Sequence, residues 1–151
     1  MEIGDKVPDL LGKDENGNEI RVSDFNGRKA IIYFYPKDST PGCTAEACSV
    51  RDNYEKLLAA GYAVVGVSVD SAASHRKFKE KHGLPFPLIS DADKELVSTF
   101  GVWQEKRMCG RTYMGIVRTT FVIDENGCVS KIYGPKEIKT AKHGEQLLDL
   151  A

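Results

Sequence analysis

The stretch that decides the fold spans residues 30–43 and reads AIIYFYPKDSTPGC. Its first six residues are β-branched, aromatic or small and show no polar alternation, which is typical of a strand buried on both faces of a sheet. This strand ends at Pro36. Thr40 then suits the N-cap of a helix, and Pro41 suits the first helical position, where a missing N–H costs nothing. The stretch therefore predicts a central strand, a loop and a helix that begins beside Cys43.

Strands and helices alternate along the rest of the chain. Besides 30–35, the expected strands span residues 18–22, 63–69, 87–90, 119–124 and 129–133, and the expected helices span residues 41–60, 71–82, 92–100 and 139–150. Turn signals at 14–17 and 125–127 indicate hairpins. This order predicts one α/β domain over residues 1–151, with a central mixed β-sheet flanked by helices and an N-terminal β-hairpin extension.

Composition excludes several classes of function. The 151 residues are 41% hydrophobic and 28% charged, which is ordinary for a globular protein. Because 21 basic residues meet 22 acidic ones, the net charge of −1 provides no general basic surface for nucleic acid or an anionic membrane. No apolar run is long enough to cross a bilayer, and the first residues lack a secretory signal. We therefore expect a cytoplasmic protein, and a monomer, since no large apolar interface is marked.

Four cysteines are too few for a disulfide scaffold, but one of them has a reactive setting. Cys43 lies in the first turn of the expected helix, where free N–H groups and the helix dipole stabilise a thiolate. Gly42 lets a small substrate approach the backbone donors beside the sulfur. The alternative is that Cys43 only fills a gap in the packing.

The surrounding motifs resemble one family. Pro36, three residues, then Thr40-Pro41-Gly42-Cys43 resemble the peroxidatic loop of peroxiredoxins. The run CTAEAC over residues 43–48 resembles the subgroup called bacterioferritin comigratory protein or peroxiredoxin Q. Further similar segments extend the resemblance over nearly the whole chain, and they cover residues 4–9, 23–27 and 113–121.

This resemblance implies a thioredoxin-like fold and the reduction of hydrogen peroxide or alkyl hydroperoxides. It implies that Cys43 is the peroxidatic thiolate, which becomes a sulfenic acid. Thr40 would hydrogen-bond the peroxide, and Pro36 would help to shield the sulfur from water. Arg118 would hold the thiolate and polarise the leaving oxygen, because a nearby guanidinium favours the charged form of a thiol and stabilises charge as the O–O bond breaks.

The other cysteines divide into two groups. By the resemblance, Cys48 is the resolving residue, which forms a redox-active disulfide with Cys43 that thioredoxin or a similar dithiol reduces; a buried structural role is the alternative. Cys109 and Cys128 match no catalytic position, and we expect both to be structural, although the basic stretch around Cys109 could be exposed. Because the sulfur does the chemistry, we expect no cofactor and no metal.

Two rival readings remain open on the sequence. A thioredoxin-like oxidoreductase would normally carry Cys-x-x-Cys, whereas four residues separate Cys43 from Cys48. A zinc or iron module would need the histidines to join the cysteines, and none has metal-ligand spacing with a second ligand. His75 and His82 lie seven residues apart among basic side chains, so we expect them on the solvated face of a helix.

Overall fold

The computed structural model describes residues 1–150. Its elements follow one another along the chain as β1 (Leu10–Lys13), β2 (Glu19–Arg21), η1 (Val22–Phe25), β3 (Lys29–Phe34), α1 (Pro41–Asp52), α2 (Tyr54–Ala59), β4 (Tyr62–Ser68), α3 (Ala72–His82), β5 (Leu88–Ser90), α4 (Glu95–Thr99), β6 (Trp103–Met108), β7 (Arg111–Ile116), β8 (Thr119–Ile123), β9 (Val129–Tyr133), η2 (Thr140–Lys142) and α5 (His143–Leu148).

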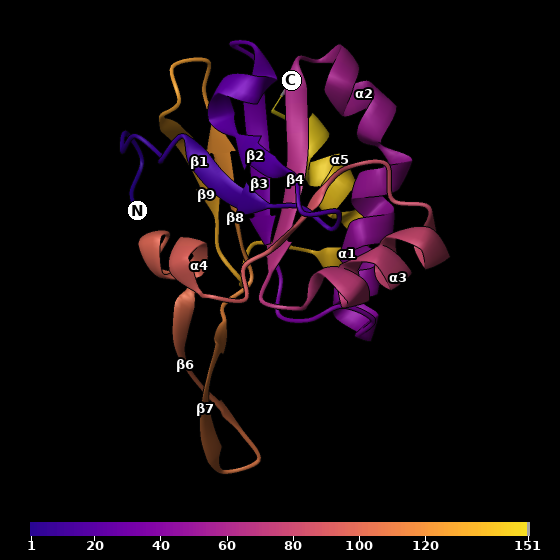
Figure 1. Cartoon of the computed structure of the whole chain (residues 1–151), viewed down its shortest axis with the longest axis vertical. Helices are drawn as coiled ribbons and strands as arrows, with labels where there is room; N and C mark the ends of the chain where they lie inside the picture. The colour runs from indigo at the N-terminus through magenta and orange to yellow at the C-terminus, as the bar shows by residue number, and fades with distance from the viewer. Residues whose placement is uncertain (151) are drawn as a thin grey trace.

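A five-stranded mixed sheet forms the centre of the molecule, in the order β5–β4–β3–β8–β9 (Figure 1). β3 pairs parallel with β4 and antiparallel with β8, so that Ile31 lies opposite both Val64 and Val122. Every residue of β4 is buried, and so is all of β3 after Lys29, as the unbroken apolar runs predict. The mixed α/β architecture and the N-terminal hairpin of β1 and β2 are confirmed.

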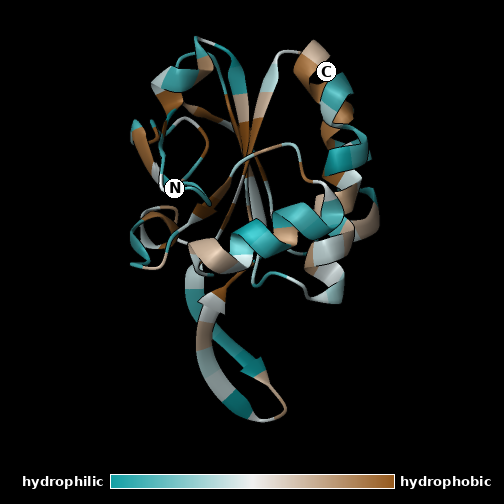
Figure 2. Ribbon diagram, turned by 45° about the vertical axis from the view of Figure 1, so that its right-hand side comes forward, coloured by the Kyte–Doolittle hydropathy of each residue, from teal (hydrophilic) through white to brown (hydrophobic). Residues whose placement is uncertain are grey.

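Apolar side chains cover both faces of this sheet. Alternate residues of β3 point to opposite faces, as the pleat requires. Ile32 and Phe34 belong to the cluster that includes Phe100 after α4, and the rings of Phe34 and Phe100 lie 5.1 Å apart. Ile31 belongs to the second cluster, with Val50 of α1. The helices α1, α2, α3 and α5 accordingly lie on one side of the sheet, and the N-terminal hairpin and α4 lie on the other (Figure 1). Hydrophobic colouring gathers on the central strands, whereas α3 is mostly hydrophilic outside (Figure 2).

Three expected helices have different bounds in the structure. The helix expected over 41–60 divides into α1 and α2 at Asn53, whose amide Nδ2 donates to the Ser49 carbonyl at 2.8 Å and so competes with the helical backbone bonds. The helix expected over 92–100 shortens to α4, because Lys94 before it adopts a left-handed backbone. The terminal helix expected over 139–150 becomes η2 followed by α5.

One hairpin was not expected. β6 and β7 pair antiparallel and project from the body of the molecule, with Cys109 and Gly110 at the tip (Figure 1). The base of this hairpin is closed by a hydrogen bond from Val117 N to Val102 O at 2.8 Å. Within residues 1–150 no helix is long and apolar enough to cross a membrane.

Candidate active site

The pairing of β3 with β8 brings Cys43 and Arg118 together. Cys43 is the third residue of α1, and it is only 1% exposed. Arg118 directly precedes β8, whose first residue, Thr119, pairs with Phe34 at the end of β3. Arg118 Nη2 donates to Cys43 Sγ at 3.2 Å, although the two residues are 75 positions apart. The structure therefore places the predicted cysteine and arginine in one site.

This contact suits an ionised sulfur. A guanidinium within hydrogen-bond distance favours a thiolate, and so does the N-terminus of a 12-residue helix. A Cβ at Gly42 would lie 3.4 Å from Arg118 Nη2, so the glycine leaves room beside the guanidinium. The arrangement can hold a nucleophilic sulfur with a cation beside the atom that it attacks.

Glu46 is a site residue that the sequence analysis missed. It lies one helical turn after Cys43, and its side chain is 0% exposed. Its Oε1 accepts from Arg118 Nη1 at 2.5 Å. Burial raises the pKa of Glu46 to about 7, although the charge and the hydrogen bond of Arg118 act in the opposite direction. The spacing of three between Cys43 and Glu46, which puts both on one helix face, was the available signal.

Burial disfavours the charged forms of the other titratable groups near this ion pair, His143 and Tyr33. Within residues 1–150, Glu46 Oε2 has no hydrogen-bond partner, and it lies 3.8 Å from His143 Nε2. His143 Nε2 is also 2.8 Å from the hydroxyl of Thr120, and burial lowers the pKa of this histidine. The buried hydroxyl of Tyr33 likewise has no partner, and burial raises its pKa well above the ordinary value. Arg118 therefore provides the positive charge in contact with the sulfur, and Lys106 lies near enough for its charge to interact with both Cys43 and Arg118.

The loop between β3 and α1 carries the other predicted residues. Thr40 is the N-cap of α1, as predicted, and its carbonyl accepts from Thr44 N at 2.8 Å. Its hydroxyl does not cap the helix but donates to the Lys37 carbonyl at 2.9 Å. Pro36 is half-buried at the start of the loop, and Pro41 is exposed at its end.

Cys48 lies on the same helix as Cys43, but the two sulfurs are not bonded. Cys48 is half-buried, and its Sγ lies 3.9 Å from Nδ1 of His82 on α3. Cys109 is exposed at the hairpin tip with a left-handed backbone, so the expected structural role does not rest on burial there. Cys128 is half-buried after the turn between β8 and β9.

The expectation of a solvated face for His75 was wrong. His75 is 0% exposed, because it and Phe78 form the inner stripe of α3, whereas neighbours such as Lys77 face outward. Its ring lies close to the carboxylate oxygens of Asp38 and Asp70, but Nδ1 faces Asp38 and Nε2 faces the carbonyl of Ile89, so neither ring nitrogen is free to bind a metal ion. No cysteine of residues 1–150 belongs to that group.

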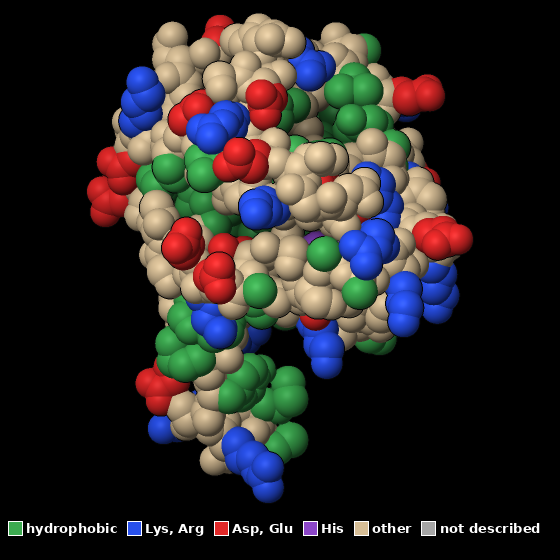
Figure 3. Space-filling model, in the orientation of Figure 1, with side chains coloured by type: hydrophobic (Ala, Val, Ile, Leu, Met, Phe, Trp, Pro, Cys, Tyr) green, Lys and Arg blue, Asp and Glu red, His purple; other side chains and the backbone are tan. Residues whose placement is uncertain are grey.

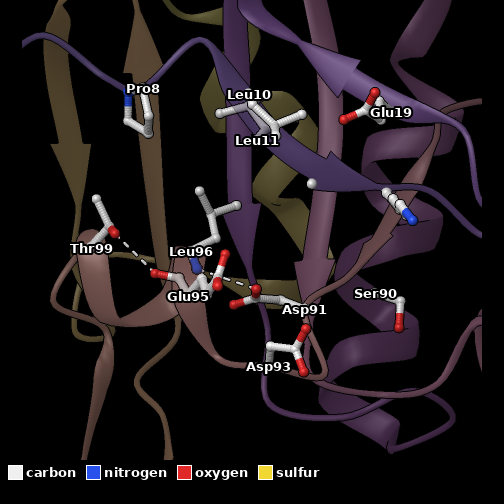
Figure 4. Close-up of a pocket in the computed structure, with 12 residues that line it drawn as sticks. Pro8, Leu10, Leu11, Glu19, Ser90, Asp91, Asp93, Glu95, Leu96 and Thr99 are labelled. Carbon is white, nitrogen blue, oxygen red and sulfur yellow. Dashed lines mark hydrogen bonds between the residues drawn. The ribbon is translucent and has the colours of Figure 1, made fainter.

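A cavity of about 400 Å³ lies elsewhere, between the N-terminal hairpin and the start of α4 (Figure 4). Several acidic side chains line it, including Glu19, Asp93 and Glu95. Asp91, also in its wall, accepts hydrogen bonds from the backbone N–H groups of Leu96 and Val97 at the start of α4, although the N-cap residue itself is Lys94. None of the Cys43 site residues lines this cavity.

The sequence and the structure are both similar to those of known proteins. Residues 3–132 match the model of the AhpC/TSA family. Peroxiredoxin Bcp of Bacillus subtilis is 45% identical over 148 residues, which are 98% of this chain and 93% of that protein. Peroxiredoxin Bcp of Escherichia coli K12 is 40% identical over 149 residues, 99% of this chain and 94% of that one. A structure of the bacterioferritin comigratory protein of Xanthomonas campestris, described for its alkyl peroxide reduction activity, superimposes with a TM-score of 0.85 at 35% identity and covers 97% of this chain and 96% of its own.

Proposed function

Since the chain belongs to the AhpC/TSA family and is similar over nearly its whole length to peroxiredoxins of the Bcp type, we propose that it is a thiol peroxidase that reduces hydrogen peroxide and alkyl hydroperoxides. The thioredoxin-like fold implied by the sequence motifs is confirmed by the similarity to the Xanthomonas campestris structure. The observation that carries the proposal is the 3.2 Å contact between Arg118 Nη2 and Cys43 Sγ in the first turn of α1.

In the first step, the thiolate of Cys43 attacks the terminal oxygen of the peroxide. The O–O bond breaks, the leaving oxygen takes the electron pair and a proton and departs as water or alcohol, and the cysteine becomes a sulfenic acid. Arg118 stabilises the charge that develops on the leaving oxygen. Thr40 and Pro36, which precede Cys43 in the loop, bind the peroxide and limit the access of water in this proposal.

In the second step, Cys48 resolves the sulfenic acid. Its thiolate attacks Cys43 Sγ, hydroxide leaves and takes up a proton to form water, and an intrachain disulfide results. Thioredoxin or a similar dithiol then reduces this disulfide by thiol–disulfide exchange. The cycle uses only sulfur chemistry, and we propose that a monomer completes it without nucleic acid or a membrane surface as partner.

The test is peroxide consumption by the purified protein with and without a thioredoxin system. We expect turnover only with the reductant, and its loss in Cys43→Ser. Arg118→Met should lower the rate of the first turnover by about 10²-fold or more, because the developing charge loses its cation. Lys77→Ala, on the exposed face of α3, is the matched control.

Comparable peroxide turnover in wild type and Cys43→Ser would contradict the proposal. Reduction of insulin disulfides without peroxide consumption would favour the rival thiol–disulfide oxidoreductase, and stoichiometric zinc in the purified protein would favour the metal-binding module.

A further inference from the structure

The loop that precedes Cys43 is anchored by the buried carboxylate of Asp38. The side chain of Asp38 is 2% exposed, although it lies in the loop between Pro36 and Thr40. Its Oδ1 accepts from the hydroxyl of Tyr35 at 2.6 Å. Its Oδ2 accepts from the hydroxyl of Ser74 at 2.8 Å and lies 2.7 Å from Nδ1 of His75. The loop is therefore tied to β3 and to α3 through a single side chain.

The backbone of the same residue makes a further tie. Asp38 N donates to Oδ2 of Asp70 at 2.8 Å, and this oxygen also accepts from the hydroxyl of Ser68 at 2.6 Å. Ser39, which follows, has a left-handed backbone with a φ of 62°. Such a backbone is unfavourable for a residue with a side chain, so the neighbouring anchors must hold it. The position of Thr40 depends on these anchors.

The hydrogen-bond partners of His75 determine its proton count. Nε2 lies 2.9 Å from the carbonyl oxygen of Ile89, which can only accept, so Nε2 carries a proton. Nδ1 faces a carboxylate oxygen of Asp38 at 2.7 Å, and two lone pairs would repel one another at that distance. One further proton therefore lies between the ring and the carboxylate.

We propose that Asp38 and His75 form a buried carboxylate–imidazolium pair that fixes the loop from Pro36 to Thr40 over Cys43, with His75 as a positioning residue for the peroxidase reaction. This role rests on the proposed function, whereas the ion pair itself does not.

The charges around the pair agree with a proton on the ring. The titratable groups that face His75 are Asp38 in the loop, Tyr35 from β3 and Asp70 after β4. Within residues 1–150 no other basic side chain pairs with either carboxylate. Burial alone would raise the pKa of Asp38, but hydrogen bonds from His75 and Tyr35 outweigh it and hold this pKa below the ordinary value. Burial raises the pKa of Tyr35 well above its ordinary value, so its hydroxyl remains a donor.

The pair acts on the loop and not on the sulfur. Cys43 lies in α1 and Arg118 directly precedes β8, and within residues 1–150 neither makes a hydrogen bond or ion pair with Asp38 or His75. Weakening the pair should therefore displace Thr40 and Pro36 while the thiolate keeps its cation. A reaction that needs the whole loop, such as peroxide reduction, should slow. A reaction that needs only the thiolate, such as alkylation by iodoacetamide, should not.

Asp38→Asn tests the positioning role, because the amide keeps the shape and an acceptor for Tyr35 but removes the charge. We expect the rate constant for the reduced protein with hydrogen peroxide to fall about tenfold or more. Alkylation of Cys43, followed on its own peptide by mass spectrometry, should change by less than about threefold. Lys77→Ala, an exposed position on α3 beside His75, is the control. His75→Gln, which can restore one hydrogen bond to Asp38, should lose less activity than His75→Leu.

Two outcomes would overturn the positioning role: equal losses of peroxide and iodoacetamide reactivity in Asp38→Asn, or no loss of either. A wild type that does not react with peroxide would overturn the proposed function together with this role. The pair itself is tested in the wild type by ring-nitrogen NMR, in which both nitrogens of His75 should be protonated at neutral pH. An unprotonated Nδ1 would overturn the ion pair, whatever the kinetics show.

Discussion

At the scale of single residues, Glu46 links the site to the stability of the fold. It is a carboxyl group without access to water, and one of its oxygens has no hydrogen-bond partner. Ionisation of Glu46 balances the charge of Arg118, but it also places a second anion near Cys43. Its raised pKa means that the folded protein holds this proton over a pH range in which the unfolded chain has lost it.

The pKa of Glu46 in the unfolded chain and its pKa in the folded protein together decide how stability changes with pH. Between the ordinary pKa of 4.5 and the folded value of about 7, the folded state binds more protons at Glu46 than the unfolded state. The contribution of Glu46 to the free energy of unfolding therefore decreases as the pH rises across this window, by linkage by about 3 kcal/mol.

Glu46→Gln removes this titration. We expect the stability difference between the variant and wild type to shift in favour of the variant as the pH rises from 4.5 to 7. Urea unfolding of the reduced proteins across this range measures it, with Glu55→Gln on the exposed face of α2 as the control. Parallel stability curves for Glu46→Gln and wild type would contradict the raised pKa.

The sequence predicted some residues of the site and not others for a physical reason. Cys43 stands in a local pattern whose chemistry is visible in the chain itself, whereas Arg118, 75 positions away, was predicted only because its segment resembles that of a known family. His75 meets Asp38 across 37 positions, and Glu46 meets Arg118 across 72. A polar side chain among basic neighbours is expected on the surface when its buried partner is distant in the sequence, and His75 was predicted on the solvated face for this reason.

At the scale of elements, the second half of α1 is anchored to α5, whereas the first half carries the site residues that bond to Arg118. The backbone N–H of Gly144 on α5 donates to Oγ of Ser49 at 2.9 Å. A Cβ at Gly144 would lie 2.2 Å from the Ser49 carbonyl, so only glycine permits this approach. Cys43 and Cys48 both precede Ser49. The part of α1 that is anchored to α5 therefore begins at Ser49, directly after Cys48.

The proposed disulfide requires the first half of α1 to unwind. Five residues along a regular helix separate two Cα atoms by roughly 8–9 Å, since the rise is about 7.5 Å. A disulfide spans about 4.4–6.8 Å. Unwinding costs least at a helix end, but here it must also expose the buried side chains of Cys43 and Glu46 and remove Glu46 from Arg118, which favours the folded helix until Cys43 is oxidised.

We therefore expect oxidation to lower amide exchange protection from about residue 43 to Cys48 and to leave it in place from Val50 onward. Exchange is compared in reduced and oxidised protein, with Cys48→Ser treated with peroxide as the control that cannot form the bond. Equal protection in both states, with the Cys43–Cys48 bond confirmed by mass spectrometry, would show that the helix is already open before oxidation.

Element boundaries were predictable where burial sets the pattern. The strands at 30–35 and 63–69 are buried on both faces and were placed closely. The hairpin of β6 and β7 was missed because most of its side chains are exposed on both faces, so no apolar alternation marks it. Its turn is formed by Cys109 and Gly110, both with positive φ, and a cysteine there is not a recognisable turn signal.

At the scale of the whole molecule, the site and the cavity of about 400 Å³ occupy separate parts. The site forms at the end of the sheet where the loop after β3, the start of α1 and the start of β8 meet, and α1 lies on the side of the sheet that the larger helices cover (Figure 1). The order of the strands explains this arrangement, because β8 returns antiparallel beside β3 and delivers Arg118 to the end at which α1 begins.

The projecting hairpin is the part of the molecule least involved in the core. Hydrophobic and basic side chains lie along it (Figure 3), and Met108 and Met114 are 63% and 51% exposed. A two-stranded ribbon alone contributes little stability in water. Trp103 and Ile116, which face each other at its base, pack against the core cluster instead.

Replacing residues 105–114 with Asn-Gly should therefore leave the body folded. Gln104 and Gly115 are paired in the hairpin, so a two-residue turn can join them, and the bond from Val117 N to Val102 O remains to close the base. We expect the free energy of unfolding in urea to change by less than about 1 kcal/mol, because no fully buried side chain is removed. Ile116→Ala, which creates a cavity at a residue 1% exposed, should cost about 2–5 kcal/mol and is the positive control. A loss of cooperative unfolding in the shortened chain would show that the hairpin is part of the core structure after all.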